Sequence, residues 1–460
     1  SNKKYENTAI VLDKYLKGGI ERHTDLLEKE LNADVLVFNQ YSKRYKKIND
    51  SICSKYDVVL WQNVFNKLPP KATNQKYIYI VHSQCDWWND NQRMIVKENN
   101  HLIDIYIYVS NSVKDNFEKN ILIPDNNYVI ENQLPEMKND RQEIPGLFVS
   151  SGSFNKMKGH FELIQQFSKL DNSNTLEIYG DIHNIDYFNT LQKHIIDNKL
   201  DNIKLFEYTD KYIERLKEAE YFCLFSKSEG CCYSILEAIS LNKKIICGKK
   251  CLTDNMLDYP NLRHSFDIFN KSLNVYDNSY YFKISYEFII NNIINDIAIS
   301  DEIYKKFYNY ISQKTRYDVT VLTPSYNCSR NYLSLLSKSI EDQTFRNNFW
   351  LIMNDASSNK DSIDFLNELN TKKNTLVFSN FNNLGLSANR NAGWNKTKSP
   401  YILFIDDDDY ISNNCIEKYV WYLSNSDNYF VYSHYETFGN RSIEFRYNSD
   451  RGSKNLTENG

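Results

Sequence analysis

The chain has 460 residues, and 55 Lys and Arg residues against 59 Asp and Glu residues give a formal net charge of −4. This near balance argues against a nucleic-acid-binding protein that works through bulk positive charge. Apolar residues make up 41% of the chain, which is typical of a globular protein rather than a disordered one. No stretch of about 18 apolar residues predicts a transmembrane helix. The length predicts about three domains.

The ends and the cysteines suggest where the protein works. The chain begins at Ser1 without an initiator Met or an apolar signal segment, so we expect it to be a piece of a longer protein. The 9 Cys residues are scattered with no CxxC pair. That pattern favours a reduced, cytoplasmic protein over a disulfide scaffold or a zinc site.

Short apolar runs alternate with polar or amphipathic helical stretches over the first two thirds of the chain. This βαβ rhythm predicts two tandem Rossmann-like domains of class α/β, residues 1–137 and 138–315, the second ending in helices from Tyr280 to Lys314. The strands expected in the first domain are 9–12, 34–38, 57–61, 77–81 and 105–109. Those expected in the second are 147–150, 176–179, 203–206, 221–225 and 244–247.

A third α/β unit, residues 316–460, begins abruptly at Asp318. Its expected strands are 319–322, 350–353, 375–378 and 401–405, and the polar tail from Asn448 is expected to be disordered.

Two loops of the first two domains have features that suit anion binding. Gly18 and Gly19 follow the first strand and open a helix, where glycines let backbone N–H groups approach an anion. Alone, a plain tight turn explains them equally well. In the second domain, the loop from Gly152 to Gly159 carries Lys158, whose ammonium can reach a diphosphate. A single Lys is more often a solvated surface residue than a diphosphate ligand.

The sharpest signal is a pair of glutamates that follows the strand at 221–225. Glu229 falls in a loop and Glu237 lies about two helical turns further on. Between them, the amides of Gly230, Cys231, Cys232 and Tyr233 form a helix N-terminus suited to phosphate. The alternative is an ordinary helix with charged residues in its first turns.

Taken together, these motifs resemble the retaining glycosyltransferases of family 4, which have the two-domain GT-B fold. The resemblance covers residues 8–315. It implies that Glu237 binds the ribose, and that Glu229, His82 and Lys158 act catalytically near the sugar and the diphosphate. It also implies that the donor contacts Gly18, Gly19, Ser153 and the loop Gly230–Tyr233, and that no cofactor is needed.

Two positions qualify this resemblance. The family's diphosphate-binding Arg is replaced by Ser153, so neutralisation of the donor's charge falls to Lys158, the helix amides and Lys156. Asn132 matches the family's interdomain "N-G-D" position, although Gln133 and Leu134 depart from it.

Residues 316–460 carry a second constellation. A strand ends in Pro324-Ser325-Tyr326-Asn327, a second is followed by Asn354-Asp355, and Arg390 lies in Asn389-Arg390-Asn391. The run Asp406 to Asp409 ends an apolar strand. Clustered carboxylates are tolerated when they are solvated or when they bind a hard divalent cation such as Mg²⁺ or Mn²⁺.

This order of motifs resembles the nucleotide-binding half of family 2 glycosyltransferases, which have the GT-A fold. The resemblance implies that Pro324, Tyr326, Asp355, Arg390 and Asp406 form the donor pocket. It also implies that Asp408, with Asp406, holds Mg²⁺ or Mn²⁺. The module is expected to be incomplete, because nothing marks Glu436, Glu444 or Asp450 as the general base.

The expected function is transfer of a sugar from a nucleotide-sugar, with uridine diphosphate as the nucleotide, to a glycan or lipid-linked acceptor of a bacterial surface polysaccharide. The alternative is that only the first module catalyses and the GT-A-like part is a docking or regulatory module. Peripheral contact with the inner face of the membrane would use Lys43 to Lys47 and the pair Trp87-Trp88. The alternative explanations are a solvated loop for the basic segment and core side chains for the two tryptophans.

Overall fold

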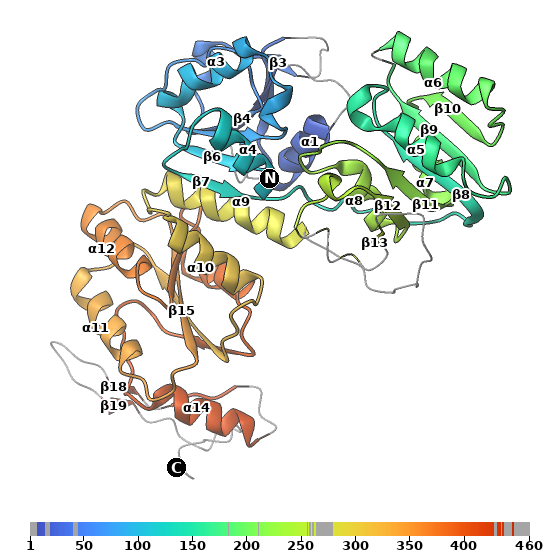
Figure 1. Cartoon of the computed structure of the whole chain (residues 1–460). Helices are drawn as coiled ribbons and strands as arrows, with labels where there is room; N and C mark the ends of the chain where they lie inside the picture. The colour runs from blue at the N-terminus through green and yellow to red at the C-terminus, as the bar shows by residue number, and fades with distance from the viewer. Residues whose placement is uncertain are drawn as a thin grey trace. The chain divides into compact units, whose positions relative to one another are not determined.

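The computed structural model describes residues 7–13, 19–39, 45–182, 184–209, 211–254, 256, 259, 262–263, 279–426, 430–433, 435–436 and 444–445 (Figure 1). The chain divides into two compact units, Ser1–Glu287 and Phe288–Gly460. Of the expected features, Gly18, residues 40–44 and the tail from residue 446 lie outside the described residues.

The first sheet is parallel and has the strand order β3-β2-β1-β4-β5-β6-β7. All five predicted strands are present, and most of their residues are buried because helices cover the sheet. The sequence missed two short edge strands, β3 and β7, whose polar residues hide the apolar pattern. The strands are β1 (Thr8–Leu12), β2 (Asp34–Val37), β3 (Lys46–Lys47), β4 (Val58–Gln62), β5 (Lys76–Val81), β6 (Ile105–Tyr108) and β7 (Asn127–Val129). The helices are α1 (Gly19–Leu31), α2 (Asp50–Cys53), α3 (Asp90–Asn99) and α4 (Asn111–Asn120).

The second sheet is also parallel, in the order β10-β9-β8-β11-β12-β13. Its core packs Phe148, Phe167 and Leu191 between strands and helices. The strands are β8 (Ile144–Ser151), β9 (Thr175–Gly180), β10 (Ile203–Glu207), β11 (Ala219–Leu224), β12 (Lys244–Cys247) and β13 (Leu262–Arg263). The helices are α5 (His160–Phe167), α6 (Ile185–Asp197), α7 (Lys211–Glu218) and α8 (Tyr233–Ser240).

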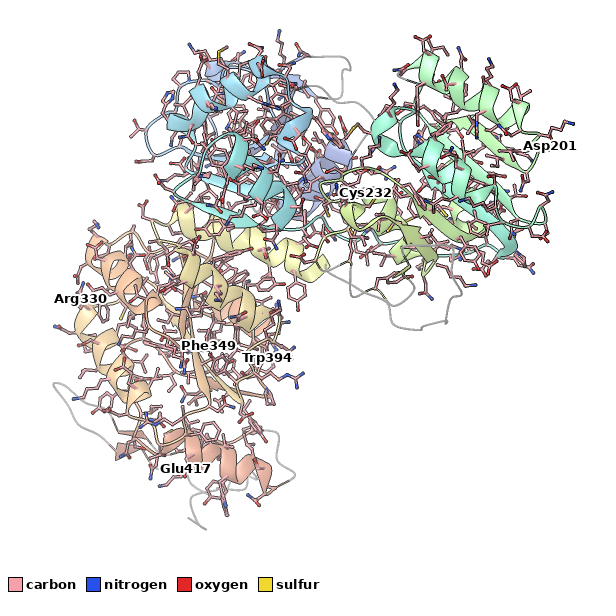
Figure 2. The ribbon with its side chains drawn as sticks, in the orientation of Figure 1. Asp201, Cys232, Arg330, Phe349, Trp394 and Glu417 are labelled. Atoms are coloured by element: carbon pink, nitrogen blue, oxygen red, sulfur yellow. The ribbon has the colours of Figure 1, made fainter. Side chains whose placement is uncertain are left out.

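The third sheet, in the second unit, has the order β16-β15-β14-β17, all parallel. Phe349 lies in its second strand (Figure 2). The strands are β14 (Val319–Ser325), β15 (Asn348–Asn354), β16 (Thr375–Ser379) and β17 (Tyr401–Phe404), and β18 (Tyr435–Glu436) pairs antiparallel with β19 (Glu444–Phe445). The helices are α9 (Ser279–Ile294), which crosses the division between the units, α10 (Asp301–Ile311), α11 (Arg330–Glu341), α12 (Lys360–Asn370), α13 (Leu386–Trp394) and α14 (Cys415–Ser424).

The division after Glu287 differs from the expected boundary at 315/316. The second half of α9 and all of α10 pack with the third sheet instead of ending the second domain. The Asn292 side chain donates to the Val377 carbonyl at 3.1 Å, and the Tyr310 ring stacks on Phe349 with centroids 4.1 Å apart. A helix that is apolar on most sides gives no sequence signal of which core it joins.

The three sheets share one arrangement of strands, and this determines where ligands can bind. In each, the first strand lies between the second and the fourth strand that the sheet has in chain order, so the strand order reverses beside it. In doubly wound sheets, ligands bind at the carboxyl ends of the strands flanking this switch point. Here the switch points lie between β1 and β4, between β8 and β11, and between β14 and β17.

No helix among the described residues is both long and apolar enough to cross a membrane. The expected tryptophan pair for surface contact is also divided, because Trp88 is buried and its indole N–H donates to the Ser83 hydroxyl at 2.9 Å. Trp87 is exposed. The expectation that both rings could touch a bilayer is therefore wrong for Trp88, which is a core residue.

Gly159 combines a left-handed backbone conformation with a close approach to the chain after β11. Its φ is +66°, and a Cβ there would lie 2.0 Å from the Phe225 carbonyl oxygen. We expect Gly159→Ala to lower the free energy of unfolding by about 3 kcal/mol or more, since both the backbone conformation and the contact are lost. Gly146→Ala is the matched control: φ is +74°, but the nearest atom lies at 3.0 Å. Urea unfolding compares them, and equal losses would contradict the importance of the contact.

Candidate functional site

Lys158 and Glu229 meet at the switch point of the second sheet. Lys158 follows β8 and Glu229 follows β11, and the Lys158 ammonium lies 2.5 Å from Glu229 Oε1. The Ser226 hydroxyl also donates to this oxygen, at 2.6 Å. Burial lowers the pKa of Lys158, but the Glu229 carboxylate outweighs burial and the net pKa is raised. The structure thus brings together two of the three expected catalytic residues as a charged pair.

Glu237, in α8, is buried and pairs with an arginine that the sequence analysis did not single out. Arg22 of α1 donates to Glu237 Oε1 and to the Tyr208 hydroxyl, the latter at 3.0 Å. The second carboxylate oxygen, Oε2, is buried and has no hydrogen-bond partner among the described residues. Burial raises the pKa of Glu237 to about 7, against the lowering effect of Arg22 and of the Tyr212 hydroxyl. One oxygen of this carboxylate is therefore paired with Arg22, whereas the other has only the nearby Tyr212 hydroxyl beside it and no hydrogen bond among the described residues.

The position of Arg22 in the sequence indicates that it lies near the expected site. Arg22 lies in the first turn of the helix that Gly19 opens, so it is presented at the carboxyl end of β1. A cation there faces the switch point of the first sheet. What the sequence does not state is that its partner lies 215 residues away.

His82, the third expected catalytic residue, follows β5 and is half-buried. Its Nε2 hydrogen bonds with Gln62 Oε1, and its ring packs edge-on against the buried His23, with centroids 4.6 Å apart. Burial holds the pKa of His82 well below its usual range and lowers that of His23 to about 3. Both imidazoles are therefore neutral near pH 7, so His82 can act as a hydrogen-bonding group but not as a fixed cation.

The loop between the two glutamates contacts the first sheet's domain. A Cβ on Gly230 would lie 2.3 Å from the His82 carbonyl oxygen, so only glycine allows this approach. The Asn132 amide donates to the Cys231 carbonyl at 2.9 Å, which ties the interdomain segment to the same loop. Together these contacts place His82 beside Glu229 and the start of α8.

The other expected donor-binding positions surround that loop. Cys232 is the residue that precedes α8 (Figure 2), and the ring of Tyr233 lies 3.6 Å from where a Cβ on Gly19 would be. Ser153 is half-buried in the turn after β8 and supplies no charge. Lys156 is exposed, and among the described residues Lys158 and Arg22 are the cations paired with the two glutamates.

In the second unit, Asp355 is committed to its own loop. Its carboxylate accepts from the Asn380 amide at 2.7 Å and from the backbone N–H groups of Leu384 and Gly385 at 2.9 and 2.8 Å. It therefore shapes the loop before α13. Pro324 is buried at the end of β14 and Tyr326 beyond it is exposed, with its ring available at the carboxyl edge of the sheet.

Arg390 and Asp406 form an ion pair across the switch point between β14 and β17. Arg390 Nε is buried and has no hydrogen-bond partner among the described residues. Two of the five residues that the resemblance assigns to the donor pocket are thus brought together, one neutralising the other.

The acidic turn after β17 divides its carboxylates by environment. Asp408 is exposed, whereas burial raises the pKa of Asp407, which also interacts with Ser325 and Cys328. Burial and the charges of its neighbours raise the pKa of Asp409. Among the described residues, no group of three or more His, Cys, Asp or Glu side chains is arranged to hold a metal ion. The turn therefore fits a divalent cation only if a bound diphosphate supplies further oxygen ligands.

Comparison with protein families agrees with this layout. Residues 135–257 match the family described as "Glycosyl transferases group 1", and residues 320–458 match "Glycosyl transferase family 2". The first match contains Lys158, Glu229 and Glu237, and the second contains Asp355 and Asp408. Two successive segments of the chain are therefore similar to two glycosyltransferase families, as the motifs predicted.

The curated relatives match over shorter stretches. "Glycosyltransferase GlyA" of Streptococcus pneumoniae is 34% identical over 99 residues, which are 22% of this chain and 14% of that protein. An "Uncharacterized glycosyltransferase" of Haemophilus influenzae is 34% identical over 101 residues, 22% of this chain and 40% of that protein. "Minor teichoic acid biosynthesis protein GgaB" of Bacillus subtilis is 34% identical over 103 residues, 22% of this chain and 11% of that protein. The chain thus spans less than half the length of each.

Among solved structures, Anabaena Alr3699/HepE in complex with UDP-glucose superposes with a TM-score of 0.45 and 15% identity, covering 53% of this chain and 80% of that one. A glycosyltransferase from Rickettsia africae superposes with a TM-score of 0.46 and 15% identity, covering 63% and 90%. The fold assignment for this chain rests on its own strand orders.

Proposed function

We propose that this chain transfers a sugar from a uridine diphosphate sugar to a glycan or lipid-linked acceptor, with the first module as the active, retaining enzyme. The observation that carries the proposal is Glu237 Oε2, a buried carboxylate oxygen without a partner among the described residues. Ribose hydroxyls are donors that would satisfy it, since a buried acceptor left unpaired is costly. The family match of residues 135–257 supports the same reading.

The charged groups around α8 suit a departing diphosphate. Lys158 and the backbone N–H groups at the start of α8 lie at the same switch point, and a helix N-terminus favours negative charge. As the bond from the sugar to the diphosphate breaks, negative charge grows on the leaving group, and Lys158 can transfer its ion pair from Glu229 to that group. This is electrostatic stabilisation by preorganised groups. Glu229, once released, and neutral His82 are left to contact sugar hydroxyls.

For the second module, we propose a metal-dependent nucleotide site on the acidic turn. Asp408 is exposed, and Asp406 lies two residues before it. Mg²⁺ or Mn²⁺, when bound with the diphosphate, would neutralise this turn and the nucleotide together. Tyr326 supplies an exposed ring on which a base can stack.

A second candidate function has its own support. The Asp355 carboxylate accepts hydrogen bonds from the backbone of Leu384 and Gly385, and Arg390 neutralises Asp406. These internal contacts favour a module that keeps its fold but positions a partner or a growing chain instead of catalysing.

One experiment separates these proposals: calorimetric titration of the whole chain with UDP, once with Mn²⁺ and once with a chelator. Two sites with metal and one without support nucleotide binding by both modules. A single site that is indifferent to the chelator supports the docking alternative for the second module. Absence of binding in both conditions would contradict the choice of nucleotide and the role of Glu237.

The acceptor is proposed from the relatives. GgaB is described as a protein of teichoic acid biosynthesis, and a bacterial surface polymer of that general kind is the acceptor class proposed here. Peripheral contact with the inner face of the membrane remains part of this proposal, with Trp87 and the exposed Lys46 and Lys47 as the described groups that could take part.

Removing the arginine beside Glu237 should shift the pH dependence of nucleotide binding to higher pH. In Arg22→Met, the lowering effect of Arg22 on the Glu237 pKa is lost, so that pKa rises above about 7. Only the ionised carboxylate has both oxygens as acceptors. We expect UDP affinity at pH 7 to fall about tenfold or more, the value of one hydrogen bond to a charged group, and to recover as the pH rises to 9.

The control for this variant is Arg141→Met, because Arg141 pairs with Glu214 on an exposed surface of the same unit. Calorimetry at pH 6, 7, 8 and 9 measures all three proteins. A deficit of Arg22→Met that is the same at every pH would show that the arginine contacts the nucleotide directly and does not control Glu237.

A further inference from the structure

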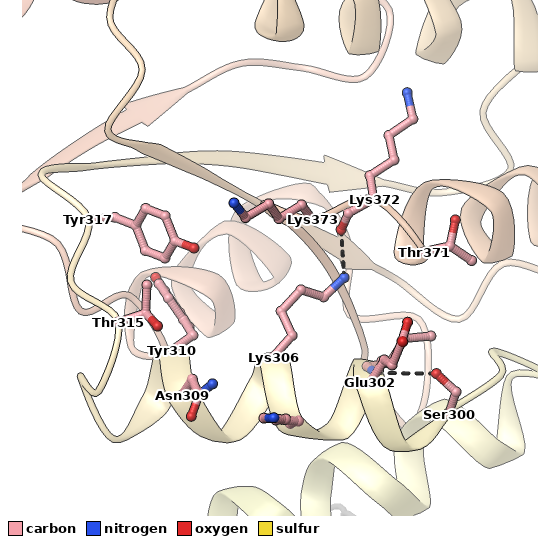
Figure 3. Close-up of a pocket in the computed structure, with 12 residues that line it drawn as sticks. Ser300, Glu302, Lys306, Asn309, Tyr310, Thr315, Tyr317, Thr371, Lys372 and Lys373 are labelled. Atoms are coloured by element: carbon pink, nitrogen blue, oxygen red, sulfur yellow. Dashed lines mark hydrogen bonds between the residues drawn. The ribbon is translucent and has the colours of Figure 1, made fainter.

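A basic pocket of about 360 Å³ lies in the second unit, at the opposite edge of the sheet from the acidic turn. It is formed by α10, by the segment that leads into β14, and by the segment between α12 and β16 (Figure 3). Thr315 and Tyr317 precede β14, and Thr371 to Lys373 precede β16. The pocket therefore sits at the amino ends of parallel strands, whereas the residues expected to bind the donor sit at the carboxyl ends.

The Lys306 side chain extends across the pocket, and its ammonium has one N–H group that is not used in a hydrogen bond to a described residue. Its ammonium donates to the carbonyls of Asn370 and Lys372, at 2.6 and 2.8 Å. An ammonium has three N–H donors, so one is left over. Burial lowers the pKa of Lys306 to about 8, only partly offset by Glu302. The site thus holds a desolvated cation whose charged form would gain from an anion.

Two further lysines line the pocket without a carboxylate partner. Lys305 and Lys373 are exposed, and neither they nor Lys306 form an ion pair within 4.0 Å with any described residue. Figure 3 shows the Lys373 side chain extending toward Tyr317. Lys372 differs, because its ammonium leaves the pocket to bind Glu341 and Ser337. Three unpaired cations against Glu302 alone give the pocket a positive charge.

Neutral donors complete the lining. The Thr315 hydroxyl and the Asn309 amide have no hydrogen-bond partner among the described residues, and both belong to the pocket wall. Lysine binds phosphate as a point charge, and hydroxyl and amide donors add direction. A tetrahedral, doubly charged oxyanion can use several such groups at once, while a single carboxylate uses fewer.

We propose that this pocket binds a phosphate ester of a small polyol or sugar. Its volume falls in the range of small-molecule sites, about 300–1,000 Å³, which leaves room for more than the phosphate itself. Because the pocket opens at the amino edge of the sheet, its ligand is distinct from the nucleotide-sugar. The pocket binds a phosphate-bearing glycan or a phospholipid headgroup, and the nucleotide-sugar binds at the carboxyl edge of the sheet.

The test uses the whole chain at low salt, where surface charge is least screened. Glycerol 3-phosphate is titrated by calorimetry with glycerol as the uncharged comparison, and vesicles containing phosphatidylglycerol are tested by sedimentation. The key variant is Lys373→Met, since Lys373 is exposed and its loss leaves the fold intact. The matched control is Lys360→Met, an exposed lysine at the other end of α12.

We expect glycerol 3-phosphate to bind, Lys373→Met to weaken it about tenfold, as expected for loss of one charge-assisted contact, and Lys360→Met to leave it unchanged. Vesicle binding that Lys373→Met alone abolishes, without binding of the soluble ester, assigns the ligand to a lipid headgroup. Equal losses in Lys373→Met and Lys360→Met, or no binding of either probe, would overturn the proposal.

A second measurement, the pKa of Lys306, distinguishes ligand binding in the pocket from an effect of the substitution on folding. Isotope-labelled lysine NMR follows the Lys306 pKa, which is about 8 in the free protein. Saturation with glycerol 3-phosphate should raise it, because an anion stabilises the charged ammonium. An unchanged Lys306 pKa at saturation would place the ligand elsewhere. The result should not change with a chelator or with UDP, which separates this site from the nucleotide sites.

Discussion

Replacing Lys158 with Met should weaken UDP binding by the first module about tenfold or more, the loss expected for a charged hydrogen bond in a desolvated site. Lys158 is the cation that the fold places between β8 and β11, with its ammonium 2.5 Å from Glu229. Since Ser153 supplies no charge, no second cation from the loop after β8 takes over, and exposed Lys156 does not reach the pair. The deficit should therefore not be compensated.

Lys158→Met should lower the turnover rate more than it lowers the affinity for UDP. Charge on the diphosphate grows as the sugar leaves, so a cation aimed at it is worth most in the transition state, where removal of one stabilising donor costs about 10²–10³ in rate. Release of UDP from a UDP-sugar by hydrolysis measures this without an identified acceptor. Lys193→Met, an exposed lysine of α6 in the same domain, is the control.

Removal of Lys158 also leaves Glu229 buried without its ion-pair partner, so stability must be measured alongside activity. Breaking one side of a buried pair typically costs several kcal/mol, about 3–5. The double variant Lys158→Met, Glu229→Gln restores neutrality and separates the two effects. If the double variant regains full UDP affinity, the contribution of Lys158 is structural and the catalytic assignment fails.

Much of this architecture could be predicted from the sequence because the strands are buried on both faces. Runs such as residues 58–61 and 319–323 are continuous apolar or β-branched segments between polar helices. The order of such runs predicts parallel sheets, and the position of the motifs after particular strands predicts the edge at which they gather. The strands that the sequence missed, such as β3 at Lys46–Lys47, lie at sheet edges and lack this pattern.

The partners of the two glutamates could not be predicted in the same way. The spacing from Glu229 to Glu237 indicates one helical segment, but it says nothing of the side chains that neutralise each carboxylate. Arg22 lies 215 residues from Glu237, and only the packing of α1 against α8 brings them together. Likewise, the hydrogen bonds that Asp355 accepts from Leu384 and Gly385 depend on a loop that no local pattern predicts. Its expected contact with the nucleotide stays a prediction.

Replacing Asp408 with Ala should abolish the metal-dependent part of UDP binding and leave the metal-independent part intact. Asp408 and Asp409 are the exposed residues of the turn, while Arg390 neutralises Asp406 and burial raises the pKa of Asp407. The charge of Asp408 also contributes to the raised pKa of Asp409, so these carboxylates repel one another. A divalent cation relieves that repulsion only when it can bind Asp408 directly.

Asp342→Ala, which removes an equally exposed carboxylate just after α11, is the control for the change in net charge. Titration with UDP in Mn²⁺ should show two sites in the unaltered chain and in Asp342→Ala, and one site in Asp408→Ala. The remaining site should match the site seen with chelator, since Glu237 and Lys158 need no metal. Two metal-dependent sites in Asp408→Ala would mean that the acidic turn is a solvated surface feature and that the second module binds its nucleotide elsewhere.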